Sequence, residues 1–130
     1  MPEPSSPLVL IVEDDTVIAQ LLAILCAQLG FRAIKAASGE AALATLEQER
    51  PQLITLDLNL PQLSGQEVLA RLRASEAVCA TPVVVVSALD PEEEVWEQAD
   101  AVVKKPFEVD DLITLMQRLI APPLQERAVG

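Results

Sequence analysis

Residues 8–15 read LVLIVEDD, an unbroken aliphatic run that stops at three consecutive carboxylates. Five aliphatic residues in a row are typical of a strand that is buried on both faces, as in a parallel sheet. Carboxylates gathered directly after such a strand repel one another, and burying them is costly unless a cation compensates their charge. The stretch therefore predicts a central parallel strand with a charged site at its carboxyl end.

The rest of the chain repeats this alternation of aliphatic strands with segments whose apolar residues follow helical spacing. Five such strand–helix units joined by short links predict an α/β fold, in which a doubly wound parallel sheet has helices on both faces. The predicted strands are 8–12, 31–36, 52–58, 82–88 and 101–104, and the predicted helices are 16–29, 38–49, 66–75, 91–98 and 107–120.

The length of 130 residues indicates one domain. We expect residues 1–7, which are acidic and rich in proline, to form a flexible lead, residues 8–121 to form the domain, and residues 122–130 to be a tail or the start of a linker. Neither a signal peptide nor an apolar run of about 20 residues is visible, so we expect a cytoplasmic protein without membrane insertion.

The composition excludes several classes of function. The chain is 51% hydrophobic but only 2% aromatic, so its core must be aliphatic, and it has no histidine for general base catalysis or metal ligation. A net charge of −11 repels nucleic acid and anionic membranes, so we expect no direct nucleic acid binding. Cys26 and Cys79 lie in apolar surroundings, and we expect two buried free thiols.

Polar groups follow four of the five predicted strands, at the end where open parallel sheets form their sites. An oxygen-rich cluster without histidine suits Mg²⁺, which combines one or two carboxylates with water and phosphate oxygens. Lysine and serine are suitable partners for a phosphoryl group. The pattern predicts phosphoryl chemistry supported by Mg²⁺. The groups are Glu13, Asp14, Asp15, Asp57, Ser87, Lys104 and Lys105.

Over residues 8–120 the sequence resembles the receiver, or CheY-like, domain of two-component response regulators. The resemblance rests on the acidic pair at 13–14, on TLDLNLPQLSG at 55–65, on Ser-Ala at 87–88 and on Lys-Pro-Phe at 105–107. These motifs occur in this order and each lies at a predicted strand end, which makes them specific together. The resemblance implies the flavodoxin-like strand order 2-1-3-4-5.

The resemblance also implies a role for each site residue. Asp57 would accept a phosphoryl group from a histidine kinase or a histidine phosphotransfer protein. Mg²⁺ would be held by Glu13, Asp14 and Asp57 together with the backbone carbonyl of Asn59. Such a domain catalyses only its own phosphorylation and dephosphorylation, so we do not expect an enzyme with a separate substrate. Phosphorylation would switch the binding of an output protein or domain that the sequence does not identify, and a homodimer is possible.

The resemblance assigns four further positions. Ser87 would hydrogen-bond the phosphoryl group, and Lys105 would pair with it. The Lys105–Pro106 peptide is a candidate for the cis form, since it is often cis in relatives. Pro61 and Gly65 match the turn residues of the loop that follows the acceptor.

Other charged residues near these motifs have simpler interpretations. Asp15 is expected to cap the first helix, because only two acids are needed at the site. Lys104 is expected to be a solvated neighbour. The three glutamates at 92–94 suit the first turn of a helix, where negative charge favours the helix dipole.

The sequence departs from the family pattern in two places. Relatives usually carry an aromatic residue three positions before the site lysine, where this chain has Val102, so the familiar route of signalling is in doubt. Lys105 follows Ser87 by 18 positions, about one helical turn fewer than in relatives. We therefore expect a shortened fourth helix that Trp96 anchors, and an atypical docking of output partners.

Two other functions fit parts of the pattern. A divergent receiver could act as a phosphorylation-independent protein interaction module, which the missing aromatic and the short helix favour. Retention of every chemical residue counts against that interpretation. A Mg²⁺-dependent phosphatase of related topology would need an acid two residues after the nucleophile, where this chain has Asn59.

Overall fold

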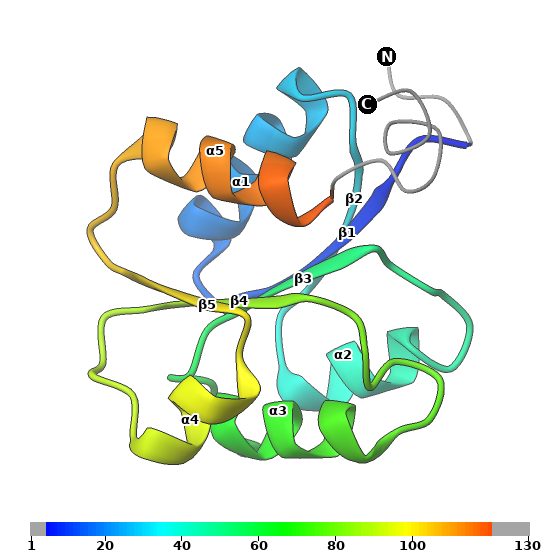
Figure 1. Cartoon of the computed structure of the whole chain (residues 1–130), viewed down its shortest axis with the longest axis vertical. Coiled ribbons are helices and arrows are strands. Elements are labelled where there is room, and N and C mark those ends of the chain that lie inside the picture. Colours follow the sequence, from blue (N-terminus) through cyan, green and yellow to red (C-terminus); the bar gives the residue numbers. More distant parts are fainter. Residues whose placement is uncertain (1–4, 121–130) are drawn as a thin grey trace, which may run out of the picture.

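The computed structural model describes residues 5–120, which form a five-stranded sheet between two layers of helices (Figure 1). The strands are β1 (Leu8–Val12), β2 (Arg32–Ala36), β3 (Leu53–Leu56), β4 (Val83–Ser87) and β5 (Ala101–Lys104). The helices are α1 (Thr16–Gln28), α2 (Gly39–Thr45), α3 (Gly65–Ala74), α4 (Glu93–Gln98) and α5 (Val109–Leu119).

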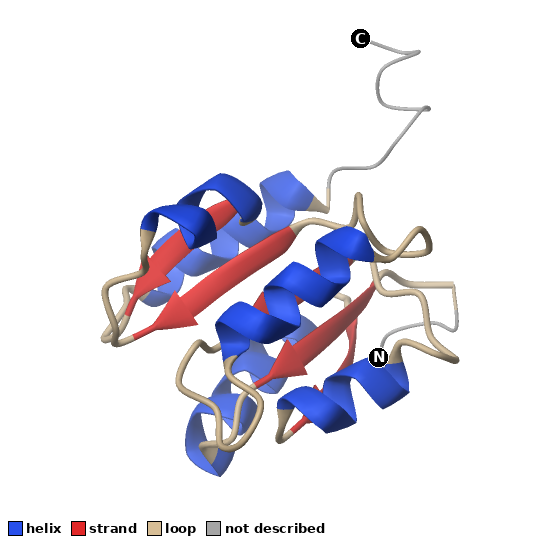
Figure 2. Cartoon of the chain, turned by 90° about the horizontal axis from the view of Figure 1, so that it is seen from below, coloured by secondary structure: helices blue, strands red, loops and turns tan. Residues whose placement is uncertain are grey.

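All strand pairs are parallel, and the strand order is β2-β1-β3-β4-β5. The arrowheads of the strands accordingly point toward one edge of the sheet (Figure 2). Helices α1 and α5 cover one face, and α2, α3 and α4 cover the other (Figure 1). The structure confirms the predicted doubly wound α/β fold and its strand order.

Strand side chains alternate between two aliphatic core layers. Leu10 and Val12 of β1 point into the layer under α2, α3 and α4, whereas Val9 and Ile11 point into the layer under α1 and α5. Every residue of β1, β3 and β4 is buried. Each fully buried aliphatic side chain contributes about 1.5–3 kcal/mol. This burial on both faces explains why these strands read as continuous aliphatic runs in the sequence.

Side-chain caps fix where α1, α2 and α3 begin. The Asp15 carboxylate accepts hydrogen bonds from the backbone N–H groups of Val17 and Ile18, at 2.9 and 3.3 Å. The Ser38 hydroxyl accepts one from the N–H of Ala41, at 3.1 Å. The predicted cap at Asp15 is confirmed. Gly30, whose φ of 84° is easy for glycine, follows the end of α1.

The second and fourth helices are shorter than average. Helix α2 ends at Thr45 instead of residue 49, because the chain tightens into turns in which the Gln48 N–H bonds the Thr45 carbonyl. Helix α4 has six residues, as the short spacing from Ser87 to Lys105 predicted.

Two predictions of burial are wrong. Trp96 does not anchor α4, because its side chain is 57% exposed and Val95, 2% exposed, occupies the core instead. Cys79 is exposed in the connection after α3, whereas Cys26 is buried in α1 as expected. Burial raises the pKa of the Cys26 thiol to about 11.

The predicted tail at 122–130 lies outside the described residues, as do residues 1–4 and residue 121. Within the predicted lead, the Ser6 carbonyl accepts a hydrogen bond from Arg32 Nε at 3.0 Å, and the Pro7 carbonyl accepts one from the Arg32 N–H at 2.8 Å. Between residues 5 and 120, none of the helices combines the length and apolarity that crossing a bilayer requires.

Candidate functional site

Three carboxylates meet at the carboxyl edge of the sheet. Glu13 and Asp14 follow β1, and Asp57 follows the adjacent strand β3. The Asp57 N–H donates to the Val12 carbonyl at 3.0 Å, which extends the ladder between the strands to Asp57. One carboxylate oxygen from each of the three acids lies within 4.8 Å of the others. Glu13 and Asp57 are buried, whereas Asp14 is exposed at the mouth of the cluster.

The Lys105 ammonium lies among these acids. Its Nζ donates to Glu13 Oε1 at 2.7 Å and to Asp57 Oδ2 at 3.4 Å. The lysine follows β5, and its backbone N–H donates to the Ser87 carbonyl at 2.9 Å, which fixes its position beside β4. The Lys105 side chain is only 15% exposed. A single cation therefore compensates two buried carboxylates.

Burial and neighbouring charges shift the pKa values of Glu13 and Lys105. Burial raises the pKa of Glu13 to about 7, although its hydrogen bonds from Lys105 and from the Asp15 N–H act in the opposite direction. Burial lowers the pKa of Lys105, but the hydrogen bond and charge of Glu13 and the charge of Asp57 outweigh it, so that this pKa is raised. The site is thus short of positive charge, and its oxygen-only donors are of the type that Mg²⁺ binds.

The loop after Asp57 is held close to the Asp57 carboxylate by backbone groups. The Asn59 N–H donates to Asp57 Oδ1 at 3.1 Å, and the Gly65 N–H donates to the Leu58 carbonyl at 3.0 Å. A Cβ atom at position 65 would lie 2.2 Å from the Asp57 carbonyl oxygen, a distance that real contacts do not reach. Only glycine allows the start of α3 to pack against the backbone of Asp57.

Ser87 ends β4 at the same edge and is fully buried. Its hydroxyl accepts a hydrogen bond from the Leu89 N–H at 3.2 Å, so it is tied to the connection that leads to α4. The adjacent Lys104 is exposed, as expected, and forms an ion pair with Asp90. The Lys105–Pro106 peptide is cis, which confirms that prediction.

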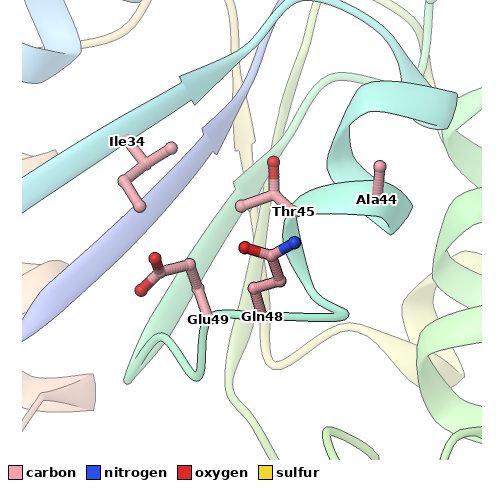
Figure 3. Close-up of a pocket in the computed structure, with 5 residues that line it drawn as sticks. All are labelled: Ile34, Ala44, Thr45, Gln48 and Glu49. Carbon is pink, nitrogen blue, oxygen red and sulfur yellow. The ribbon is translucent and has the colours of Figure 1, made fainter.

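A hollow of about 410 Å³ lies between the loop after β3 and the connection after β4. Its lining consists of Leu58, Asn59, Leu60, Ser64, Gln66, Leu89, Asp90 and Glu92. A second hollow, of about 360 Å³, lies between β2 and the end of α2 and contains none of the clustered acids (Figure 3). The first hollow joins the loop after Asp57 to the segment before α4.

The family model of the response regulator receiver domain matches residues 9–117. This chain belongs to that family.

Among curated relatives, the sensory transduction protein RegX3 of Mycolicibacterium smegmatis is 37% identical over 116 residues, which are 86% of this chain and 50% of that protein. The chain spans about half the length of these curated relatives.

Two solved structures show the same fold with ions bound. The receiver domain of the sensor histidine kinase PA1611 of Pseudomonas aeruginosa has a magnesium ion coordinated in its active-site cleft. It is 28% identical with a TM-score of 0.80, and the match covers 89% of this chain and 98% of that domain. The response regulator TrrA of Thermotoga maritima, in complex with Mg²⁺ and BeF, is 27% identical with a TM-score of 0.79, over 87% and 98% of the two chains.

Sequence reasoning placed the site residues at one edge, and the structure brings Glu13, Asp14, Asp57 and Lys105 into one cluster. The sequence did not predict that Lys105 makes its shortest contact with Glu13, because that contact joins residues 92 positions apart. The pairing of Lys104 with a loop aspartate was also missed, because nothing in the local sequence indicates it.

Proposed function

We propose that this chain is a phosphoacceptor receiver of a two-component system, in which Asp57 takes a phosphoryl group from a phosphohistidine. The donor is a histidine kinase or a histidine phosphotransfer protein. The observation that carries the proposal is the burial of Asp57 within an acid cluster that also holds a lysine. Burying a carboxylate costs free energy, and groups buried at such a cost are concentrated at functional sites, as expected if Asp57 is the reacting group.

The same residues suit a divalent cation. Glu13, Asp14 and Asp57 would hold Mg²⁺ together with the backbone carbonyl of Asn59, because hard cations prefer oxygen donors. When bound, Mg²⁺ supplies positive charge that offsets the oxygens of the incoming phosphoryl group. The magnesium ion in the cleft of the Pseudomonas receiver domain supports this assignment.

The transfer itself is a displacement at phosphorus. A carboxylate oxygen of Asp57 forms a bond to phosphorus as the bond from phosphorus to the histidine nitrogen breaks and its electron pair returns to the imidazole. Lys105 Nζ, which already lies 3.4 Å from Asp57 Oδ2, donates to a phosphoryl oxygen, and the Ser87 hydroxyl donates to another. Later attack of water on the acyl phosphate releases phosphate and restores Asp57.

Phosphorylation then shifts a conformational equilibrium and so changes the affinity for a partner. The Ser87 hydroxyl connects the site to α4, because it accepts a hydrogen bond from the Leu89 N–H. If the hydroxyl turns toward a phosphoryl group, this hydrogen bond changes, and the connection before α4 moves with it. Val102 packs against the core layer under α4 and has no ring to swing outward. The signal therefore leaves through the segment from Leu89 to α4.

The test is chemical modification in the presence of Mg²⁺. The wild-type chain is incubated with acetyl phosphate, and the adduct is located by intact mass and peptide mapping. Asp15→Ala is the matched control, since Asp15 lies next to the acid pair but caps α1. Modification of the wild type and of this control, but not of Asp57→Ala, is expected. An unmodified wild type, or a modified Asp57→Ala, contradicts the proposal.

A phosphorylation-independent interaction module has no support in the described residues, because the acids, the lysine and the serine at the strand ends are all in place. Binding of an output partner separates the two functions. A receiver loses its response to acetyl phosphate in Asp57→Ala, whereas a passive module would bind the partner equally well with and without that substitution.

A further inference from the structure

The hollow between the loop after β3 and the connection after β4 combines apolar and acidic residues. Its volume of about 410 Å³ lies within the range of pockets that hold small ligands. The lining includes Leu58 and Leu60, which are buried, and Leu89, which is 48% exposed. A short alkyl chain placed against these leucines would remove apolar surface from water, which favours binding.

The charged residues of this lining are Asp90 and Glu92, and both are exposed acids. Glu92 forms no ion pair within residues 5–120, and Asp90 pairs with Lys104 at the surface. Exposed ion pairs contribute little stability, so another cation can replace Lys104 beside Asp90. The net charge of −11 adds a general attraction for cations. The hollow therefore suits an ammonium group carried on an alkyl chain.

The hollow also joins the two segments that contact the reacting groups. The Asn59 N–H donates to Asp57 Oδ1 at 3.1 Å, and the Leu89 N–H donates to the Ser87 hydroxyl at 3.2 Å. Asn59 and Leu89 both line the hollow. A ligand that fills the hollow therefore holds both segments in the arrangement of this structure.

We propose that this hollow is a binding site for a small aliphatic diamine. The alkyl chain packs on the leucines, and the ammonium groups pair with the carboxylates of Asp90 and Glu92. Neutral or anionic molecules of the same length lack this pairing, so the site selects organic cations.

Binding of the diamine opposes phosphorylation. If the Ser87 hydroxyl turns toward a phosphoryl group, its hydrogen bond with the Leu89 N–H changes, and the shape of the hollow changes with it. A ligand that prefers one arrangement shifts the equilibrium toward it, and the coupling between two binding sites is reciprocal. This regulatory effect rests on the proposed function, whereas the binding site itself does not.

The experiment titrates the isotope-labelled full chain with cadaverine, a linear diamine, and follows the backbone amides by NMR. Mg²⁺ is kept saturating, and KCl at about 0.15 M screens the attraction between distant charges. We expect saturable shifts at Asn59, Leu60, Leu89 and Asp90. Pentanediol and glutarate, which have the same carbon chain without positive charge, should bind at least about tenfold more weakly.

Variants locate the site. We expect Asp90→Asn/Glu92→Gln to weaken cadaverine binding by about fivefold or more, because both carboxylates are lost. The matched double variant Glu40→Gln/Glu47→Gln removes the same charge at exposed glutamates in and just after α2, and it should change the affinity less than about twofold. Circular dichroism checks that each variant is folded.

The regulatory effect is measured with beryllofluoride, which stands in for the phosphoryl group on Asp57. We expect beryllofluoride to weaken cadaverine binding by about threefold or more, and cadaverine to weaken beryllofluoride binding by the same factor. Equal affinities for cadaverine with and without beryllofluoride contradict the regulatory effect.

Three results overturn the binding site: no saturable binding of cadaverine, shifts centred on Glu13 and Asp14 instead of the hollow, or equal losses for the two double variants. The last means a general attraction of cations to an acidic chain. The acetyl phosphate adduct is measured in parallel. If the wild type forms no adduct, the proposed function fails and the regulatory effect fails with it, whereas an adduct with unchanged cadaverine binding in Asp90→Asn/Glu92→Gln removes this inference alone.

Discussion

Replacing Lys105 by methionine leaves two buried carboxylates without their cation. At an effective dielectric constant near 20, the 2.7 Å contact with Glu13 is worth about 6 kcal/mol and the 3.4 Å contact with Asp57 about 5 kcal/mol. Desolvation of the lysine, which is 15% exposed, offsets much of this attraction. Removing one partner of a buried ion pair leaves an uncompensated buried charge. We therefore expect Lys105→Met to lower the free energy of unfolding by about 3 kcal/mol.

The assay is urea unfolding at pH 8 with EDTA, where Glu13 is ionised because its raised pKa of about 7 lies below the working pH. Lys104→Met is the matched control, since the neighbouring lysine pairs at the surface with Asp90, and it should cost less than about 0.5 kcal/mol. Added Mg²⁺ should restore part of the loss in Lys105→Met. Equal unfolding midpoints for the two lysine variants would refute the view that Lys105 compensates the acid cluster.

Three further predictions concern stability. Because the pKa of Glu13 is raised from 4.5 to about 7 on folding, the folded state binds its proton more tightly, and the free energy of unfolding without Mg²⁺ should fall by up to about 3 kcal/mol between pH 5 and pH 8. Glu13→Gln should lack this component of the pH profile. Gly65→Ala should lower the free energy of unfolding in urea by about 3 kcal/mol or more, because the new Cβ meets fixed backbone at Asp57. Gly39→Ala should lower it less, because its Cβ first meets a valine methyl group that can move. The buried Thr55 hydroxyl has no hydrogen-bond partner within residues 5–120. Thr55→Val should therefore raise the free energy of unfolding by about 1 kcal/mol, seen as a higher thermal midpoint. A lower midpoint would contradict this prediction.

The class of fold and the edge of the sheet that carries the site could be predicted because their causes are local or topological, whereas the strand order was implied by the family resemblance. A continuous aliphatic run such as Leu8–Val12 identifies a strand that is covered on both faces. The carboxyl ends of parallel strands lie at one edge, so an acid after β1 and an acid after β3 had to share that edge, and the pairing of β1 with β3 makes them neighbours. The cap at Asp15 follows from one residue and the helix that begins beside it.

The burial of individual side chains in α4 and after α3 could not be predicted in the same way. Trp96 and Val95 are adjacent apolar residues in a short helix, and only the position of α4 on the sheet decides which of them reaches the core. The exposure of Cys79 is likewise decided by tertiary contacts. Cys79 lies in the connection after α3, where its backbone carbonyl accepts a hydrogen bond from Arg73. Hydropathy alone does not report the direction in which a short segment faces.

The sequence by itself determined the class of fold, the edge of the sheet that carries the site and the acids and lysine that meet there. The tertiary structure decided how those charges are shared, with Lys105 closer to Glu13 than to Asp57, and it placed the indole of Trp96 in solvent. The physical reason is the separation along the chain of the residues that decide each feature. Strand and helix patterns arise from neighbours in the chain, whereas ion pairs and exposure depend on residues that meet only when the sheet closes against its helices.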